Sequence, residues 1–467
     1  MTIPFSVHDA LRWTDGALLS GDAEAVLSGA SIDSRTIERG ELFVAIAGPN
    51  HDGHRFVDGA VERGAAALLV ECGRTQRDTL AAPIPVIGVG DTTVALCALA
   101  AGHRSGFHGT VVAITGSNGK TTTKEMCAAI LSVAGPCHRT PGNLNNQYGL
   151  PLTLLSREER DHSMVVEFGM NHRGEIAQLV EIAHPTVGVI TNIGSAHIEY
   201  LGSREEIALE KGDLVALLPA DGTAVLNADD PLVAAQRKRT RARVLSFGTS
   251  EDADVREESV AMLDGWGYAL KLMTPAGGVS VEVSGLGSTT IANALAAVAA
   301  ALAAGASLTD IATGLSDYRP IKGRLERREL SGEIVLIDDT YNANPQSTEM
   351  ALRLLAELKG AHRGVAVLGD MGELGDTTEN AHREAGRLAA TLGIDVLIAL
   401  GDCAETVASG ALTSGMSRDC VVVATDHADA GARASAVLHE HDTVLIKGSR
   451  SMRMERVVEA ITSEKGF

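Results

Sequence analysis

The stretch that most constrains the fold is residues 110–133, TVVAITGSNGKTTTKEMCAAILSV. An apolar, β-branched run at 111–114 leads through a glycine-containing turn into a segment whose apolar residues recur at helical spacing. A strand, a glycine loop and a helix in this order form a phosphate-binding loop, because glycines let backbone N–H groups approach phosphate oxygens and the helix N-terminus adds positive potential. We therefore predict a nucleotide site at Gly116, Ser117, Asn118, Gly119, Lys120, Thr121 and Thr122.

Two side chains of this loop carry the expected chemistry. Lys120 can reach the β- and γ-phosphates, and the Thr121 hydroxyl can ligate Mg²⁺. The glycines are closer together than in the usual P-loop pattern, so the loop is a variant. The alternative interpretation is a tight strand-to-helix turn with a solvated lysine.

Composition narrows the function further. A chain of 467 residues is expected to form roughly three domains. The net charge of −20 and an aromatic content of 3% argue against a nucleic-acid-binding surface. No apolar run is long enough to span a membrane, and the six scattered cysteines are typical of free thiols in a reducing compartment. We expect a cytoplasmic protein, acting as a monomer.

The order of predicted elements indicates an α/β protein of three domains. Residues 1–85 predict a small N-terminal α/β domain, and residues 86–317 a central P-loop ATPase with a mostly parallel sheet and antiparallel additions between 242 and 285. Residues 318–467 predict a doubly wound domain of the dinucleotide-binding fold. Its strands are expected at 334–337, 365–368, 396–400, 421–424 and 444–446.

Three polar residues in apolar surroundings are candidates for a metal site. Glu167 ends an apolar strand, and His197 lies in the loop after another. Lys211 occupies the apolar stripe of a helix at 204–218, where burial would lower its pKa. A lysine there is either a structural residue with an extended stem or a reactive amine, for example one that adds CO₂ and binds metal as a carbamate.

Several motifs, taken in chain order, resemble the Mur ligase family. They cover nearly the whole chain and include ITGSNGKTTTKEM, GNLNNQYGLP, TNIGSAHIEYLGS, GRLE, DDTYNANP, LGDMGELG and IKGSR. The resemblance implies an N-terminal domain for a UDP-linked substrate, a central ATPase and a C-terminal ligase domain. It also implies ATP-dependent formation of an amide through an acyl phosphate, with ADP released. The DDTYNANP and LGDMGELG motifs imply UDP-N-acetylmuramoyl tripeptide and D-alanyl-D-alanine as substrates, in the synthesis of peptidoglycan.

The resemblance also implies roles for individual residues. Thr121 and Glu167 would hold one Mg²⁺, while His197 and a carbamate on Lys211 would hold a second. The remaining implied roles are orientation of the carbamate by Asn146, ATP binding by Lys120, Asn293, Arg324 and Asp339, binding of the UDP end by Ser34 and Arg35, and binding of the dipeptide by Asn342 and Asn344.

One departure from the family pattern concerns adenine binding. Thr289 and Thr290 stand where the family usually has His-Asn, and only Asn293 is kept. Two other functions therefore stay open: another amide ligase of the same superfamily, and a nucleotide-binding protein without turnover.

Overall fold

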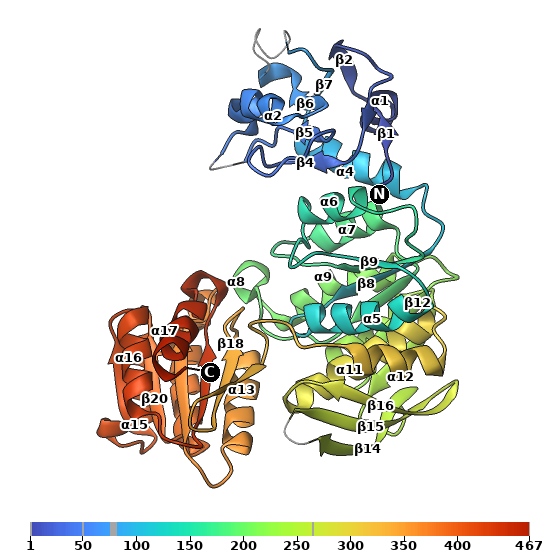
Figure 1. Ribbon diagram of the computed structural model, residues 1–467. Coiled ribbons are helices and arrows are strands. Elements are labelled where there is room, and N and C mark those ends of the chain that lie inside the picture. Colours follow the sequence, from blue (N-terminus) through green and yellow to red (C-terminus); the bar gives the residue numbers. More distant parts are fainter. Residues whose placement is uncertain (1, 49–50, 75–81, 264–265, 467) are drawn as a thin grey trace.

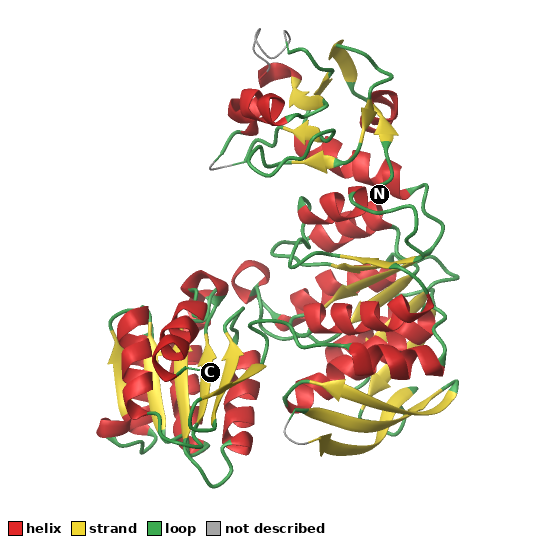
Figure 2. Ribbon diagram, in the orientation of Figure 1, coloured by secondary structure: helices red, strands yellow, loops and turns green. Residues whose placement is uncertain are grey.

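The computed structural model describes residues 2–48, 51–74, 82–263 and 266–466. Three α/β domains follow one another along the chain, as the sequence predicts (Figure 1). The central domain lies between the other two, and each domain has its own sheet covered by helices (Figure 2). No helix in the described ranges is long and apolar enough to cross a membrane.

The N-terminal domain contains a five-stranded sheet in the order β2-β7-β6-β5-β4. The strand β7 (Val86–Val89) is buried and pairs with β2 and β6 inside this sheet. The domain boundary that we predict after residue 85 therefore falls within the N-terminal sheet. In the sequence, the short apolar run of β7 is followed directly by a polar turn, so it looks like part of a linker between domains. The other elements are β1 (Phe5–Ser6), α1 (Val7–Thr14), β2 (Ala17–Ser20), β3 (Val26–Leu27), β4 (Ala30–Ser31), β5 (Leu42–Val44), α2 (Val57–Arg63), β6 (Ala67–Glu71) and α4 (Thr92–Arg104).

The central domain is built on a nine-stranded sheet in the order β16-β15-β14-β13-β12-β11-β8-β10-β9. The strands from β9 to β14 run parallel, and only β14, β15 and β16 pair antiparallel. The antiparallel prediction for 242–285 is therefore wrong for β13, which continues the parallel sheet. The strands are β8 (Thr110–Thr115), β9 (Cys137–Arg139), β10 (Ser163–Glu167), β11 (Val187–Ile190), β12 (Thr223–Asn227), β13 (Arg243–Gly248), β14 (Val255–Leu263), β15 (Gly267–Thr274) and β16 (Gly277–Ser284).

Helices cover both faces of the central sheet because its inner strands are apolar on both sides. Val112 and Ile114 of β8 pack on one face, while Val111 and Ala113 pack on the other. The first face is covered by α5 (Lys120–Ala134), α11 (Gly287–Ala303) and α12 (Leu308–Asp317). The second face is covered by α6 (Gly149–Leu155), α7 (Glu175–Ala183) and α9 (Arg204–Ala216); α8 (Ile198–Leu201) and α10 (Pro231–Ala234) are short connecting helices.

The C-terminal domain confirms the predicted doubly wound sheet. Its order is β17-β18-β22-β19-β20-β21, and every pair except β17 with β18 is parallel. The strands are β17 (Glu326–Leu330), β18 (Ile334–Asp339), β19 (Gly364–Gly369), β20 (Val396–Leu400), β21 (Val421–Ala424) and β22 (Thr443–Lys447). The helices α13 (Pro345–Leu358), α14 (Thr378–Thr391) and α15 (Ala404–Thr413) cover one face, and α16 (His427–Val437) and α17 (Glu455–Lys465) the other.

Candidate active site

The phosphate-binding loop connects β8 to α5, as predicted, and two of its residues must be glycine. Gly116 and Gly119 have positive φ values of 150° and 82°. A Cβ atom would lie 1.9 Å from Thr191 Oγ1 at Gly116 and 2.2 Å from Asn293 Oδ1 at Gly119. The loop is also tied to the end of the neighbouring strand, because Asn192 accepts hydrogen bonds from the backbone of residues 117 and 118. The backbone is therefore held in one shape before any ligand binds.

Buried polar atoms without partners lie at the start of α5 and at the end of the adjacent strand. Thr121 Oγ1 and Glu167 Oε2 are both buried and have no hydrogen-bond partner among the described residues. The other carboxylate oxygen of Glu167 accepts a hydrogen bond from Asn145 Nδ2 at 2.8 Å. Lys120 Nζ donates to the carbonyl of Gly116 at 2.8 Å, and burial lowers its pKa. Because a buried oxygen is costly to leave unpaired, these two oxygens suit the coordination of a cation such as Mg²⁺.

Lys211 confirms the prediction of a lysine on the buried side of α9. Its side chain is fully buried, and Nζ has no hydrogen-bond partner in the described structure. Burial, reinforced by the charge of Lys120, holds its pKa well below the usual value. The uncharged amine is the form that reacts with CO₂, and the lowered pKa favours that form, so the environment of Lys211 is compatible with a carbamate.

His197 lies at the start of α8 and joins the central domain to the C-terminal domain. Its Nδ1 atom is 2.6 Å from Oε2 of Glu373, which follows β19. Burial is the main cause that lowers the pKa of His197, and the close contact with His197 lowers the pKa of Glu373. Glu373 belongs to the LGDMGELG motif, but the sequence does not predict its contact with His197.

The C-terminal domain contributes polar groups to the same site. The guanidinium of Arg324 lies 4.0 Å from the centre of the Tyr341 ring. Asp339 accepts a hydrogen bond from Lys447 Nζ at 2.5 Å. Asn344 Nδ2 donates to Oδ1 of Asn118 in the phosphate-binding loop at 2.8 Å, which joins the two domains directly.

A cavity of about 320 Å³ lies between the central and C-terminal domains and brings most predicted residues together. Thr289 and Thr290 also line it; the Thr290 hydroxyl is already bonded to the carbonyl of Leu286. The predicted residues that line the cavity are Ser117, Asn118, Gly119, Lys120, Thr121, Thr122, Glu167, His197, Asn293, Arg324, Asp339, Asn342 and Asn344.

Five predicted residues do not line this cavity: Gly116, Lys211, Asn146, Ser34 and Arg35. Asn146 Oδ1 accepts hydrogen bonds from the backbone of residues 148 and 149, so its side chain caps α6, and Asn145 occupies the place beside Glu167. Adjacent asparagines in one loop cannot be distinguished by sequence pattern alone. Ser34 and Arg35 lie in the N-terminal domain, where the exposed side chain of Arg35 pairs with Asp33 at 2.7 Å.

The fold and the site define an ATP-dependent ligase: a phosphate-binding loop opens onto a cavity that a second, doubly wound domain completes. Family profiles match three segments: "Mur ligase family, catalytic domain" over 26–104, "Mur ligase middle domain" over 114–301 and "Mur ligase, glutamate ligase domain" over 323–450. The chain belongs to the Mur ligase family.

Similar proteins cover almost the entire chain. The UDP-N-acetylmuramoyl-tripeptide–D-alanyl-D-alanine ligase of Escherichia coli is 36% identical, over 95% of this chain and 96% of the relative. The enzyme of the same name from Bacillus subtilis is 35% identical over 97% of each. The crystal structure of MurF from Acinetobacter baumannii has a TM-score of 0.90 and 33% identity over 99% of both chains. MurF ligase from Thermotoga maritima, solved in complex with ADP, has a TM-score of 0.80 and 30% identity over 93% of this chain and 97% of that one.

Proposed function

We propose that this chain joins D-alanyl-D-alanine to UDP-N-acetylmuramoyl tripeptide, converting ATP to ADP and phosphate. The product is the pentapeptide precursor of peptidoglycan. The observation that carries this proposal is the shared cavity, in which the phosphate-binding loop, His197 and the DDTYNANP segment of the C-terminal domain meet. Full-length similarity to the tripeptide ligases favours this acceptor over that of another superfamily ligase. A binding protein without turnover would not need this set of groups together.

The reaction needs ATP because a free carboxylate has no usable leaving group. Transfer of the γ-phosphoryl group to the terminal carboxylate of the tripeptide gives an acyl phosphate, which the dipeptide amine then attacks. Lys120 would stabilise charge on the β- and γ-phosphates, and the backbone of residues 116–122 would surround them; the position of Lys120 Nζ beside the Gly116 carbonyl supports this role. Asn293 packs against Gly119, and Arg324 and Asp339 face the same cavity, where they would contact the nucleotide.

Mg²⁺ fits the unpaired oxygens of the site. Thr121 and Glu167 would hold one ion, and His197 with a carbamate on Lys211 would hold a second. The ions would neutralise charge on the phosphates and on the acyl group. Asn145 keeps the Glu167 carboxylate oriented through its hydrogen bond.

The other proposed contacts assign the two substrates to different domains. Ser34 and Arg35 would bind the UDP end from the N-terminal domain. Asn342 and Asn344 would contact the dipeptide, and the bond from Asn344 to Asn118 supports their place at the domain junction. Asn146 would act only through the conformation of its loop, since its side chain caps α6. We also propose that the enzyme works as a monomer, which light scattering tests by measuring its molar mass in solution. We propose that it acts in the cytoplasm, where ATP and UDP-linked precursors are found.

The decisive experiment measures phosphate release from ATP with each substrate omitted in turn. The proposal predicts release that requires both the tripeptide nucleotide and D-alanyl-D-alanine, together with a product heavier by the dipeptide in mass spectrometry. Binding of ATP without release would favour the protein without turnover. Release that requires a different amine would favour another ligase of the superfamily.

A further inference from the structure

The loop at residues 370–375, part of the LGDMGELG motif, extends from the C-terminal domain to the central domain. Besides the contact of its carboxylate with His197, Glu373 accepts a hydrogen bond at its carbonyl from the backbone N–H of Glu199 at 3.5 Å. The Glu373 side chain is 41% exposed, so a ligand can reach its carboxylate from solvent. None of the roles assigned above uses this carboxylate.

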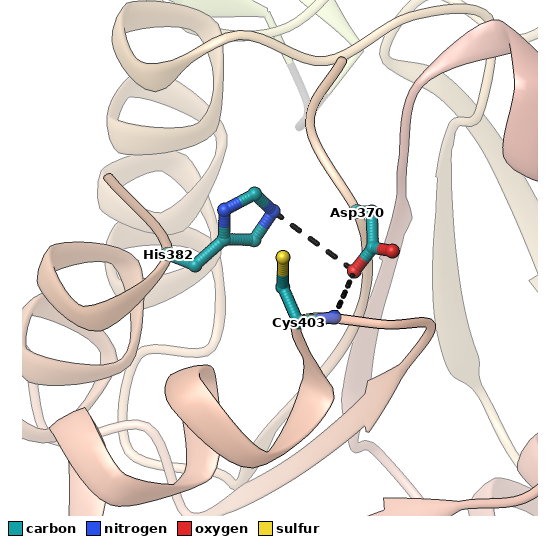
Figure 3. Close-up of side chains that lie close together, drawn as sticks. All are labelled: Asp370, His382 and Cys403. Atoms are coloured by element: carbon teal, nitrogen blue, oxygen red, sulfur yellow. Dashed lines mark hydrogen bonds and ion pairs between the residues drawn. The ribbon is translucent and has the colours of Figure 1, made fainter. Parts of the chain in front are cut away.

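Asp370, the first residue of this loop, lies close to His382 and Cys403 (Figure 3). Their ligand atoms lie within 4.8 Å of one another, a spacing that suits a metal ion. However, both ring nitrogens of His382 are already used: Nε2 accepts from the backbone N–H of Met371 at 2.9 Å, and Nδ1 lies 2.7 Å from the carbonyl of Thr378. The Asp370 carboxylate accepts two backbone N–H groups, at residue 402 and at Cys403. The cluster therefore serves as a brace for the loop.

The brace explains how Glu373 is held in an unfavourable conformation. Its φ value of 60° is left-handed, which costs free energy for a residue other than glycine. The fixed ends of the loop maintain this conformation, and the carboxylate consequently points to His197.

Residues beside Glu373 line two cavities, although Glu373 itself is not among the lining residues of either. The ATP cavity includes His197. A second cavity of about 320 Å³ includes Ile198, Pro345 and Met371. Two ion pairs also line it, Glu349 with Arg353 and Glu384 with Arg387. A small peptide in the second cavity whose amino end lay beside Met371 and Ile198 would bring that end close to Glu373 and His197.

We propose that Glu373 binds the ammonium group of the incoming dipeptide and holds its nitrogen beside His197. This inference rests on the function proposed above. The amino group of a peptide is largely protonated at neutral pH. The side chains of Lys120, Arg324 and Lys447 in the ATP cavity would repel it, whereas an accessible carboxylate compensates its charge.

The position suits the reaction that follows. A bond forms between the nitrogen and the acyl carbon, and the bond from that carbon to the phosphate oxygen breaks. The electron pair of the broken bond leaves with phosphate. The nitrogen loses two protons in becoming an amide, one of which passes to the phosphate and one to solvent.

Glu373→Gln tests the proposal because it removes the charge and keeps the size and an oxygen acceptor for His197. Ligation is measured at varied dipeptide concentration, and a parallel assay replaces the dipeptide with hydroxylamine, which is uncharged at neutral pH and traps the acyl phosphate as a hydroxamate. We expect the KM for the dipeptide to rise about 10- to 100-fold, as is typical of losing one charge-assisted hydrogen bond. The KM values for ATP and for the tripeptide nucleotide, and the rate of hydroxamate formation, stay unchanged.

Two further variants make the outcome specific. Glu373→Asp keeps the charge and is expected to restore part of the dipeptide affinity. Asp376→Asn removes one exposed charge from the same stretch and should behave as wild type. A dipeptide KM for Glu373→Gln within about twofold of wild type overturns the proposal. The proposal is also overturned if Glu373→Gln slows hydroxamate formation and raises the KM values for all three substrates together. The carboxylate would then only join the two domains. If the wild type forms neither amide nor hydroxamate, the proposed function itself fails.

Discussion

Replacing Lys211 with methionine should make the protein more stable and inactive at the same time. Lys211 Nζ is fully buried and lacks a hydrogen-bond partner in the described structure, and burial lowers its pKa. Each unit by which the pKa is lowered costs about 1.4 kcal/mol of stability, and an unsatisfied buried polar group costs a further ~1–3 kcal/mol. Methionine fills a similar volume without either cost. We therefore expect Lys211→Met to gain about 2 kcal/mol or more at neutral pH in metal-free buffer depleted of CO₂.

The pH dependence gives a second test of the same cause. With a lowered pKa in the folded state, Lys211 binds more protons in the unfolded state, so the stability of the wild type rises with pH up to the unfolded pKa of about 10.4. The advantage of Lys211→Met should shrink as the pH rises, by at most about 1.4 kcal/mol per pH unit.

Denaturant unfolding measures the stability difference, and phosphate release with both substrates measures activity. We expect ligation to fall by about three orders of magnitude or more, because the carbamate would be lost. In the wild type, ¹³CO₂ should give a carbamate signal in NMR spectra, and Lys211→Met should lack it. A destabilised methionine variant would refute the inference of an unpartnered amine, and near-normal turnover would refute the role of Lys211 in the site.

Four other substitutions test three separate parts of the structure. Asn145→Ala should reduce the rate of phosphate release at least about tenfold, because Glu167 loses the hydrogen bond that orients it. Asn146→Ala should lower the free energy of unfolding by only about 1 kcal/mol, because a helix cap is lost. Steady-state kinetics measure the first effect, and denaturant unfolding measures the second. Arg328→Met should destabilise the C-terminal domain by about 3 kcal/mol, because Asp338, buried and 2.8 Å away, loses its cationic partner; equal stability of variant and wild type in calorimetry would contradict this. Gly116→Ala should abolish ATP binding in equilibrium titrations, and normal ATP affinity would show that the loop can adapt.

Short-range patterns predicted the parts of the site that depend on neighbouring residues. The phosphate-binding loop was predictable because glycine, lysine and threonine act through the backbone of one turn. The burial of Lys211 was predictable because a helix places residues three and four positions apart on one face. The C-terminal strands were predictable because strands buried on both faces give continuous apolar runs.

Long-range packing decided the rest. Which of two adjacent asparagines faces Glu167 depends on how the loop meets α6, and strand β13 runs parallel because of its pairing with β12. The contact between Glu373 and His197 joins residues of different domains. By itself the sequence determined the kinds of groups available and the local elements that carry them. Only the tertiary structure decided which groups meet, because docking of one domain against another places side chains that no local periodicity relates.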